Sequence, residues 1–537
     1  MIIPAVKKQE IGEGKCYIQG LFCFGERKIT NFGVEYLKFF FNGEIAFSER
    51  KEEANVFFVL NNALNNGAYS LHIEESIQIE YFDAEGARNA LATLLQLIRP
   101  NGSNGYVLQR QTIEDYTDCK YRSLMIDLAR GLPPIDVLKE DLRIASLAKC
   151  NSVHFHLMDS AGLCYRSDVI KIREKISGTE LYSKEEIKEI AEYCDKLGLK
   201  IVPEIEVPAH ASGLVSCYPE LKCQTNVKEQ SNWVVCAGKE ETFELFEKLI
   251  AEICQLFPSE YIHIGGDELY FDDLTEVNNR CHWEDCVACR KRMAEEGIEG
   301  KTGLYYYVVN RIHEIVKGFG RKVILWNDQI DISKPVPLSR DCIVQFWMVT
   351  DETRGPREGC SYRKFLEEGF KVICSPFEYC YIDLEDYANP EKIASFNYVH
   401  YDNSAEYKDQ VIGCETCAWE YGNPNYTHYK YSLKSASVLL LAKMWDTRNV
   451  VYDREYRCAL SKLLLGYLMP DDYDLFEIFG SIMPPRLNDR STYFPVKRVW
   501  IDKITFQKNK RVLSELAYTY SPLYLAEILK IDELNLL

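Results

Sequence analysis

The sequence predicts an α/β protein whose main part is a (β/α)8 TIM barrel, with a small α/β domain before the barrel and a helical region after it. Two observations predict the barrel: strand-like segments recur between residues 119 and 449, and amphipathic helical segments separate most of them. A third argues against an open doubly wound sheet, which usually carries a glycine-rich phosphate loop after its first strand; this sequence has none there.

Residues 1–118 are predicted to form the small α/β domain, because a chain of 537 residues is too long for one core. Short strand-like runs are followed by a helix-like segment and then by the turn-rich run Pro100-Asn-Gly-Ser-Asn-Gly. The strand-like runs cover residues 55–60, 69–73 and 77–82, and the helix-like segment covers residues 87–98.

Residues 119–449 are predicted to form the barrel. The strand candidates are residues 121–128, 152–157, 200–207, 261–266, 322–326, 342–347, 371–375 and 411–415. Ser183 and Glu186 have the spacing of a capping box at a helix start, and Gly198 stands where that helix would end. Residues 450–537 are rich in Leu, Tyr and Arg, and we expect them to form helices that pack against the barrel.

Charge and cysteine content limit the class of protein. The formal net charge of -18 argues against nucleic acid or an anionic membrane surface as a partner, because phosphate binding needs clustered Lys and Arg. We find no apolar run long enough for a secretory signal or a membrane span, and the 20 cysteines lack the spacing of a disulfide framework. We therefore expect a cytoplasmic protein with mostly reduced thiols, whose oligomeric state stays open.

Polar and aromatic residues gather at the predicted carboxyl ends of the strands, where TIM barrels keep their reacting groups. They are carboxylates, one histidine, one arginine, one tyrosine and three tryptophans, at Asp127, Arg130, Asp159, His210, Asp267, Glu268, Trp326, Trp347, Tyr381, Asp383, Trp419 and Glu420. Indole rings pack on the apolar face of a sugar or on an N-acyl group, while charged side chains bond its hydroxyls. This end therefore predicts a carbohydrate site.

Asp267 and Glu268 are the most specific signal at this end. Adjacent residues of a strand point to opposite faces, so their side chains can converge only if the strand ends just before them. Gly265 and Gly266 would permit that turn. Repulsion between neighbouring carboxylates favours one protonated acid beside one ionised partner. A solvated surface pair is the alternative, but the position after two glycines at a strand end favours catalysis.

Four motifs in order carry a resemblance to a known family. They are Asp127-Leu-Ala-Arg130, His154-Phe-His-Leu-Met-Asp159, Glu204-Ile-Glu-Val-Pro-Ala-His210 and His263-Ile-Gly-Gly-Asp-Glu268. Together they resemble glycoside hydrolase family 20, the β-N-acetylhexosaminidases. Gly67-Ala-Tyr-Ser-Leu-His-Ile is similar to the small N-terminal domain of that family, so the resemblance covers most of the chain before its C-terminal region.

The resemblance implies an exo-β-N-acetylhexosaminidase that removes terminal GlcNAc or GalNAc from a small oligosaccharide or glycoside. It implies a retaining, substrate-assisted mechanism, in which the acetamido oxygen of the substrate attacks the anomeric carbon and forms an oxazolinium ion. Glu268 would be the general acid and base, and Asp267 would orient the acetamide. No cofactor is expected.

The resemblance also implies substrate-binding residues. They are Trp326, Trp347 and Trp419 around the acetamide, Tyr381 on its oxygen, Arg130, Asp383 and Glu420 on sugar hydroxyls, and Asp159 with His210 in support of the acid. Glu206, Ala209 and Gly131 depart from the family pattern. No glycine separates Trp419 from Glu420, so the reach of Glu420 and the preferred hexosamine stay open.

Two functions of other classes stay open beside the hydrolase. A metal-dependent amidohydrolase barrel would use ligands such as His154, His156, His210, His263 and Asp267. That enzyme would leave Glu268 and the tryptophans without a role. A non-catalytic sugar-binding protein is the other alternative. Some of these residues could instead have a purely structural role. His154 and His263 could be buried core histidines, and Trp326 and Trp347 core aromatics. Arg130 could be an ion-pair partner of Asp127.

A cysteine-rich segment follows the fourth strand. Cys281, Cys286 and Cys289, with His282, could ligate a structural Zn²⁺. Cys281 and His282 are adjacent and could not easily both ligate, so a loop with reduced thiols and no metal is the alternative.

Overall fold

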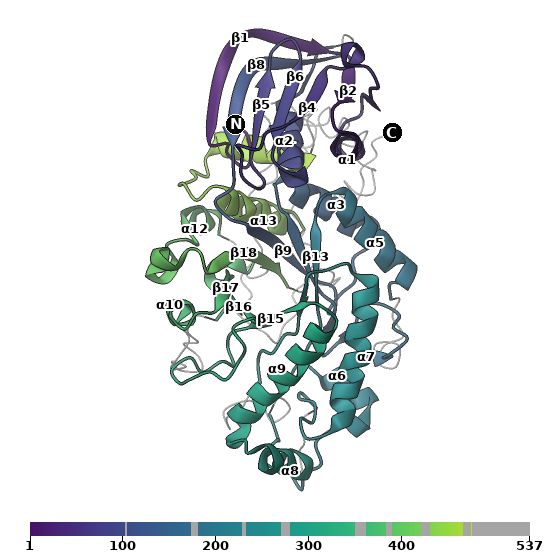
Figure 1. Ribbon diagram of the computed structural model, residues 1–537, viewed down its shortest axis with the longest axis vertical. Coiled ribbons are helices and arrows are strands. Elements are labelled where there is room, and N and C mark those ends of the chain that lie inside the picture. Colours follow the sequence, from purple (N-terminus) through teal and green to yellow (C-terminus); the bar gives the residue numbers. More distant parts are fainter. Residues whose placement is uncertain are drawn as a thin grey trace, which may run out of the picture.

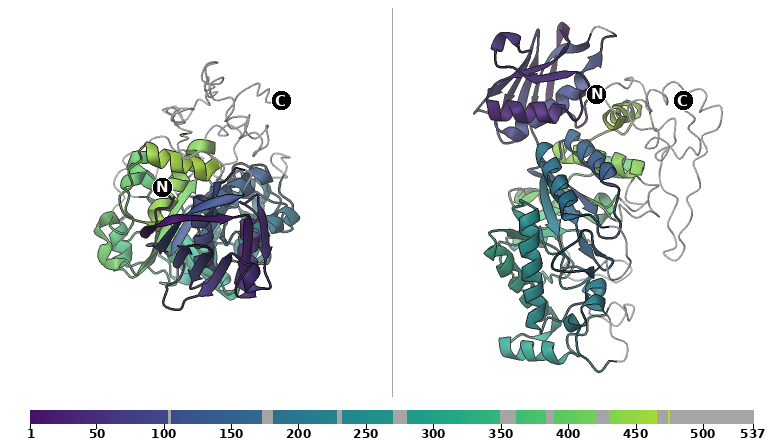
Figure 2. Two further views of the ribbon diagram at one scale, coloured as in Figure 1. Left: turned by 90° about the horizontal axis from the view of Figure 1, so that it is seen from above. Right: turned by 90° about the vertical axis from the view of Figure 1, so that its right-hand side faces the viewer.

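The computed structural model describes residues 1–102, 105–172, 181–227, 232–269, 280–348, 361–382, 389–419, 430–465 and 474. A mixed sheet at the N-terminus stands above a closed barrel of parallel strands in Figure 1. Helices α1 (Arg27–Leu37) and α2 (Ala84–Leu97) pack on one face of this sheet and contact helices of the barrel, so they lie between the two parts (Figures 1 and 2). The predicted TIM barrel with a small α/β domain is confirmed.

The N-terminal sheet has the strand order β1-β8-β5-β6-β4-β2-β3, with β7 paired to β8. Its strands are β1 (Lys8–Ile18), β2 (Gly20–Phe24), β3 (Glu44–Phe47), β4 (Val56–Leu60), β5 (Tyr69–Ile73), β6 (Ile77–Tyr81), β7 (Arg99–Pro100) and β8 (Tyr106–Asp115). The strands predicted from the sequence are β4, β5 and β6. The long β1 was missed because it is an edge strand, polar and largely exposed, without the apolar alternation that marks a half-buried strand.

The barrel closes in the order β10-β13-β14-β15-β16-β17-β18-β9. Its strands are β9 (Tyr121–Asp127), β10 (Ser152–His156), β13 (Lys200–Glu204), β14 (Tyr261–His263), β15 (Lys322–Trp326), β16 (Ile343–Phe346), β17 (Lys371–Cys374) and β18 (Val411–Ala418). Each corresponds to one predicted segment. A short hairpin of β11 (Met158–Asp159) and β12 (Gly162–Leu163) extends from the carboxyl end of β10.

Helices surround the barrel and connect its strands (Figure 1). They are α3 (Ile135–Leu147), α5 (Lys184–Lys196), α6 (Ser212–Cys217), α7 (Glu240–Leu256), α8 (Val287–Glu296), α9 (Gly300–Gly318), α10 (Tyr362–Glu367), α11 (Phe377–Cys380), α12 (Pro390–Ser395), α13 (Lys430–Trp445) and α14 (Arg454–Leu465). Helix α5 begins at the predicted capping box: Glu186 N donates to Ser183 Oγ over 3.1 Å, and Ser183 N donates to the Glu186 carboxylate over 2.7 Å.

A buried charge joins the N-terminal domain to the barrel. Lys149 Nζ lies 2.7 Å from Oδ2 of Asp115 at the end of β8, and both side chains are fully buried. Tyr69 contributes its hydroxyl at 3.0 Å from Nζ, and the ring of Trp445 lies under the ammonium at 4.3 Å. This contact brings together β8, the turn after α3 and the end of α13.

No helix in the described part of the chain is long and apolar enough to cross a membrane. Of residues 450–537, the structure describes 450–465 and 474. They include α14, which contacts α13 and α3. The helices expected farther along the chain lie outside the described residues.

Candidate active site

Asp267 and Glu268 lie in the loop that follows β14, at the carboxyl end of the barrel. The strand stops at His263, and the chain turns at Gly265 (φ 67°) and Gly266 (φ 90°), where residues with side chains are strained. A Cβ atom on Gly265 would lie 1.8 Å from Oε2 of Glu206. The two glycines therefore end the strand where the sequence required it to end.

The two carboxylates converge on one histidine. His210 Nε2 lies 3.4 Å from Oδ2 of Asp267 and 3.4 Å from Oε2 of Glu268. The Glu268 side chain is 24% exposed and the Asp267 side chain 11%, so Glu268 is the more accessible acid. Oδ1 of Asp267 is buried and accepts no hydrogen bond from the described residues. A buried acceptor without a donor is costly, so this atom is suited to accept an N–H group of a ligand.

Two residues missed by sequence reasoning hold the backbone of Glu268. Asp328 Oδ2 accepts a hydrogen bond from Glu268 N over 2.9 Å, and Trp233 Nε1 donates to Glu268 O over 2.8 Å. Asp328 follows Trp326 by two residues, so the strand-end rule could have found it. Trp233 lies far from any strand end, and no sequence signal identifies it. Its ring packs on His210 with centroids 4.4 Å apart.

A chain of charged groups extends behind His210. Asp159 Oδ2 lies 3.1 Å from His210 Nδ1, 3.1 Å from His156 Nε2 and 2.7 Å from an Arg130 nitrogen. Burial works against charge at Asp159, but Arg130 and His210 outweigh it and hold the pKa of Asp159 well below its usual range. Burial also lowers the pKa of His210, but Asp159 and Asp267 raise it well above its usual value. His210 is therefore an imidazolium beside Glu268.

Arg130 forms ion pairs with two buried carboxylates and is also partly exposed. Its guanidinium lies 2.9 Å from Asp127 and 2.7 Å from Asp159, which confirms the ion pair with Asp127. The side chain is still 25% exposed, and its Cζ atom lies 5.1 Å from the ring centroid of Trp419. These contacts fix the guanidinium at the edge of the aromatic group and leave part of it accessible to a ligand.

The four aromatic residues predicted from the sequence belong to one hydrophobic cluster at the same end of the barrel: Trp326, Trp347, Tyr381 and Trp419. Trp347 and Tyr381 are stacked with centroids 5.8 Å apart and planes at 8°, and Trp419 lies 5.9 Å from both Trp326 and Tyr381. Trp326 is 1% exposed, whereas Trp347 and Trp419 are only partly buried. The cluster therefore has a buried floor and accessible sides.

Glu204 anchors that floor from the barrel interior. Its Oε1 accepts a hydrogen bond from Trp326 Nε1 over 2.8 Å, and three buried histidines surround its carboxylate: His154, His156 and His263. Burial would raise the pKa of Glu204, but the histidines outweigh it and hold the pKa well below its usual range. His154 and His263 are thus buried within the core, as expected.

The ligand set of the amidohydrolase alternative does not gather at one point. Among the described residues, His154 and His263 group with Glu204, whereas His156 groups with Asp159 and Glu206. His210 and Asp267 belong to neither group. Within these groups, His154 is paired with Glu204 and His156 with Asp159.

Comparison with known protein families decides the relationship. The model of the catalytic domain of glycosyl hydrolase family 20 matches residues 119–433, and the model of domain 2 of that family matches residues 2–116. The chain belongs to glycosyl hydrolase family 20. The resemblance carried by the four motifs is thereby confirmed.

The curated relatives in family 20 are distant. The chain is 27% identical over 368 residues to a protein of Vibrio furnissii named beta-hexosaminidase, and 26% identical over 404 residues to beta-hexosaminidase subunit A1 of Dictyostelium discoideum. The matches cover 63% and 71% of this chain, and 56% and 70% of those proteins. A beta-hexosaminidase of Porphyromonas gingivalis is matched over 34% of its length. The chain thus spans about half or less of the length of some relatives.

Solved structures of family 20 share the fold. The beta-N-acetylhexosaminidase of Bacteroides fragilis superposes with a TM-score of 0.74 at 23% identity, covering 86% of this chain and 95% of that chain. The enzyme of Streptomyces coelicolor A3(2) gives a TM-score of 0.69 at 19% identity, covering 92% and 98%. At these identities the similarity shows the fold alone.

Glu206 stands where family 20 commonly has an aspartate, and the structure gives it unusual surroundings. Its side chain is 1% exposed, and neither carboxylate oxygen accepts a hydrogen bond from the described residues. Burial, together with the charges of Asp267 and Glu204, raises the pKa of Glu206 well above its usual value. Glu206 is therefore a neutral carboxyl group behind the family 20 acid pair. Asp383 and Glu420 lie outside the described residues.

The zinc candidate from the sequence needs a correction. Cys286 and Cys289 do belong to a cysteine cluster, but its other members are Cys223 and Cys236, and neither Cys281 nor His282 takes part. Sequence spacing shows only neighbours along the chain. Cys223 and Cys236 lie in the segment between β13 and α7, and the fold places this segment beside α8.

A cavity of about 680 Å³ lies at the opposite end of the barrel, around Tyr121, Lys200, Tyr261 and Lys371. These residues begin their strands, whereas the acid pair and the aromatic cluster stand where strands end. TIM barrels carry out chemistry at the carboxyl end, so the cavity is not part of the candidate active site.

Proposed function

We propose that this chain is an exo-β-N-acetylhexosaminidase that removes terminal GlcNAc or GalNAc from small oligosaccharides, with retention of configuration. One observation carries the proposal: Oδ1 of Asp267, which is buried and has no hydrogen-bond partner among the described residues, lies in the same loop as the accessible carboxyl group of Glu268. An acetamide N–H can satisfy the first while the second reaches the glycosidic oxygen. The names of the curated relatives in family 20 support the same activity.

The substrate supplies the nucleophile in this mechanism. Glu268 donates its proton to the leaving oxygen while the acetamide carbonyl oxygen attacks the anomeric carbon, and an oxazolinium ion forms. Glu268, now a carboxylate, then removes a proton from water, and the water oxygen bonds to the anomeric carbon as the five-membered ring opens. Asp267 accepts the acetamide N–H and stabilises the positive charge on the nitrogen.

His210 supports both carboxyl groups. As an imidazolium, it lies 3.4 Å from a carboxylate oxygen of each and stabilises the carboxylate that Glu268 becomes when it has given up its proton. Asp159 keeps His210 charged and oriented. The proposed support of the acid by Asp159 and His210 therefore has a physical basis in their contacts.

The aromatic cluster is proposed to enclose the acetamide. Trp326 would form the floor under the N-acetyl methyl group, Trp347 and Trp419 the sides, and Tyr381 would donate its hydroxyl to the acetamide oxygen. Arg130 would bond outer hydroxyls of the sugar, and we propose the same for Asp383 and Glu420. A pocket of this kind discriminates a 2-acetamido sugar from one with a plain hydroxyl.

Hydrolysis of p-nitrophenyl β-glycosides tests the proposal. We expect turnover of the GlcNAc and GalNAc glycosides but not of the glucoside, because glucose lacks the acetamide nucleophile. Glu268→Gln should lose roughly 100- to 10,000-fold in kcat, the usual contribution of a positioned acid–base group. Equal turnover of the glucoside would contradict substrate assistance. Absence of turnover, with binding of GlcNAc retained, would favour the sugar-binding alternative.

The location of the protein is a further proposal. We propose that it acts in the cytoplasm on short oligosaccharides that have entered the cell. Support comes from its cysteines, since no disulfide joins those in the described part and most of them are buried. Cell fractionation tests this, and recovery of the protein outside the cytoplasm would contradict it.

A further inference from the structure

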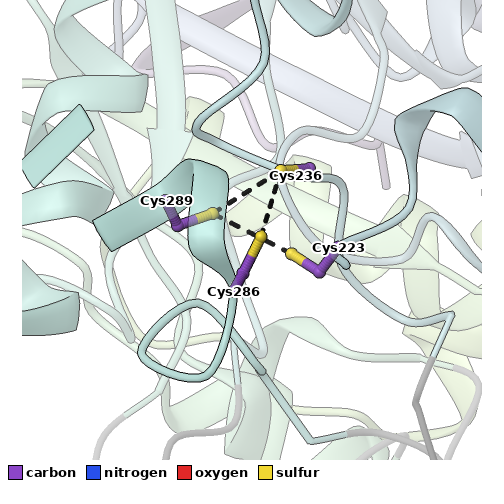
Figure 3. A group of neighbouring side chains, drawn as sticks. All are labelled: Cys223, Cys236, Cys286 and Cys289. Carbon is purple, nitrogen blue, oxygen red and sulfur yellow. Dashed lines mark hydrogen bonds between the residues drawn. The ribbon is translucent and has the colours of Figure 1, made fainter. Parts of the chain in front are cut away.

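Four cysteine side chains meet between the segment that follows β13 and the start of α8. Cys223, Cys236, Cys286 and Cys289 point their sulfur atoms toward one another (Figure 3), and the four sulfurs lie within 4.8 Å of each other. The sulfur atoms of Cys223 and Cys289 are 3.9 Å apart, those of Cys236 and Cys286 are 3.7 Å apart, and those of Cys236 and Cys289 are 3.6 Å apart.

These separations match a tetrahedral metal site and not a disulfide. Zinc–thiolate bonds are about 2.3 Å long, so the edge of a tetrahedral ZnS4 unit is about 3.8 Å. A disulfide would require sulfur atoms about 2.05 Å apart. Each of the three separations lies close to the tetrahedral edge.

The surroundings of the cluster are closed, as expected for a structural site. Cys236, Cys286 and Cys289 are fully buried and Cys223 is 8% exposed. The backbones approach closely, since a Cβ atom on Gly238 would lie 2.2 Å from the carbonyl carbon of Ala288. Only glycine lets the chain after Cys236 pass against the start of α8.

We propose that Cys223, Cys236, Cys286 and Cys289 bind one Zn²⁺ as thiolates. Binding displaces the thiol protons and needs no oxidant or reductant. A set of four cysteine sulfurs that includes a Cys-x-x-Cys pair is a ligand set of closed, structural zinc sites. Such an ion has no open position for a substrate.

The ion would tie together the two loops that carry the acid–base groups. Cys223 and Cys236 lie in the loop after β13, which also carries His210 and Trp233. Cys286 and Cys289 follow the loop that carries Glu268. A direct hydrogen bond also joins these two segments: Trp283 Nε1 donates to Val235 O over 2.9 Å. The zinc would therefore fix Trp233 at the position where it bonds the backbone of Glu268.

Metal analysis of the full chain tests the proposal, and it needs no substrate, so its outcome is independent of the proposed hydrolase activity. Protein purified without chelator is expected to contain one zinc per chain. After removal of zinc, added Co²⁺ should give the absorption of tetrahedral cobalt with four thiolates. Uptake of neither metal would overturn the proposal, as would a disulfide among the four cysteines or iron in place of zinc.

Cysteine-to-serine variants test which residues bind the zinc. Cys236→Ser and Cys286→Ser are expected to lose zinc, whereas Cys281→Ser, at a buried cysteine just outside the cluster, is expected to keep it. Zinc retained by the first two variants or lost from the third would contradict the ligand set. In wild type, chelation should speed hydrogen exchange in α6 and α8 and leave α13 unchanged; unchanged exchange in α6 and α8 would contradict the tie between the loops.

Discussion

Asp159 Oδ2 lies 3.1 Å from His210 Nδ1, and both side chains are almost completely buried. The pairing fixes which imidazole nitrogen faces the acid pair and keeps the ring charged. His210 thus acts on Asp267 and Glu268 as a fixed positive charge, and that charge depends on Asp159, which lies on the far side of the ring from them.

Asp159→Asn tests this dependence. The charge of Asp159 contributes to the raised pKa of His210, so the loss of this charge should lower that pKa. The alkaline limb of the plot of kcat against pH should therefore move to lower pH. A limb that moves by one pH unit corresponds to about 1.4 kcal/mol of lost interaction with the charged imidazole. The measurement is the pH dependence of kcat with the GlcNAc aryl glycoside. A uniform loss of kcat with an unmoved limb would indicate a purely structural role.

The buried histidines predict how stability depends on pH. Burial lowers the pKa of His154, but Glu415 and Glu204 outweigh it and raise the pKa from 6.5 to about 10. A group whose pKa is higher in the folded than in the unfolded protein contributes its full stabilisation at pH values below the unfolded pKa. That contribution is lost as the pH rises through the folded pKa. We therefore expect the free energy of unfolding to fall between about pH 6.5 and 10.

The carboxylates of this network act in the opposite direction. The pKa values of Glu204 and Glu415 are lowered from 4.5, so their contribution is complete above that value and is lost as pH falls below it. Urea unfolding followed across both ranges checks both slopes. Stability that stays constant or rises above pH 6.5 would contradict the role of His154.

Asp115→Asn is expected to destabilise the joint between the two domains by about 3–5 kcal/mol, because it leaves the fully buried Lys149 without its charge partner. Glu260→Gln is a matched control. The Glu260–Lys322 pair also has a 2.7 Å separation but is more than half exposed, so its loss should cost less than about 1 kcal/mol. Denaturant unfolding measures both, and similar costs would refute the importance of burial.

Gly265→Ala is expected to abolish most activity, because its Cβ atom would meet the Glu206 carboxylate at 1.8 Å and displace the loop with the acid pair. Gly297→Ala is the control. That glycine has a similar φ of 64° but nothing within 4 Å of the added atom, so only backbone strain of about 1 kcal/mol applies. Activity assays and melting curves separate the two. Equal effects would show that strain, and not the contact, decides.

Barrel strands were predictable because buried parallel strands are short apolar runs between amphipathic helices, and β15 (Lys322–Trp326) coincides with its predicted segment. The acid pair was predictable because Gly265 and Gly266 mark the end of a strand. Asp328 was missed although it stands just after the end of β15, whereas Trp233 was not predictable, since its role depends on how loops from different strands meet. Cys223 and Cys236 were missed for the same reason: 50 residues separate Cys236 from Cys286.

The network around Glu204 has a consequence for how this barrel can change over evolutionary time. Replacing His154, His156 or Glu204 alone would strand a buried charge, at a cost of several kcal/mol, although an apolar set of similar volume could be neutral. A single substitution in this network therefore destabilises the protein, whereas a joint replacement of the whole set does not. Descendants of this chain should keep these residues together or lose them together, while nearby surface positions drift independently.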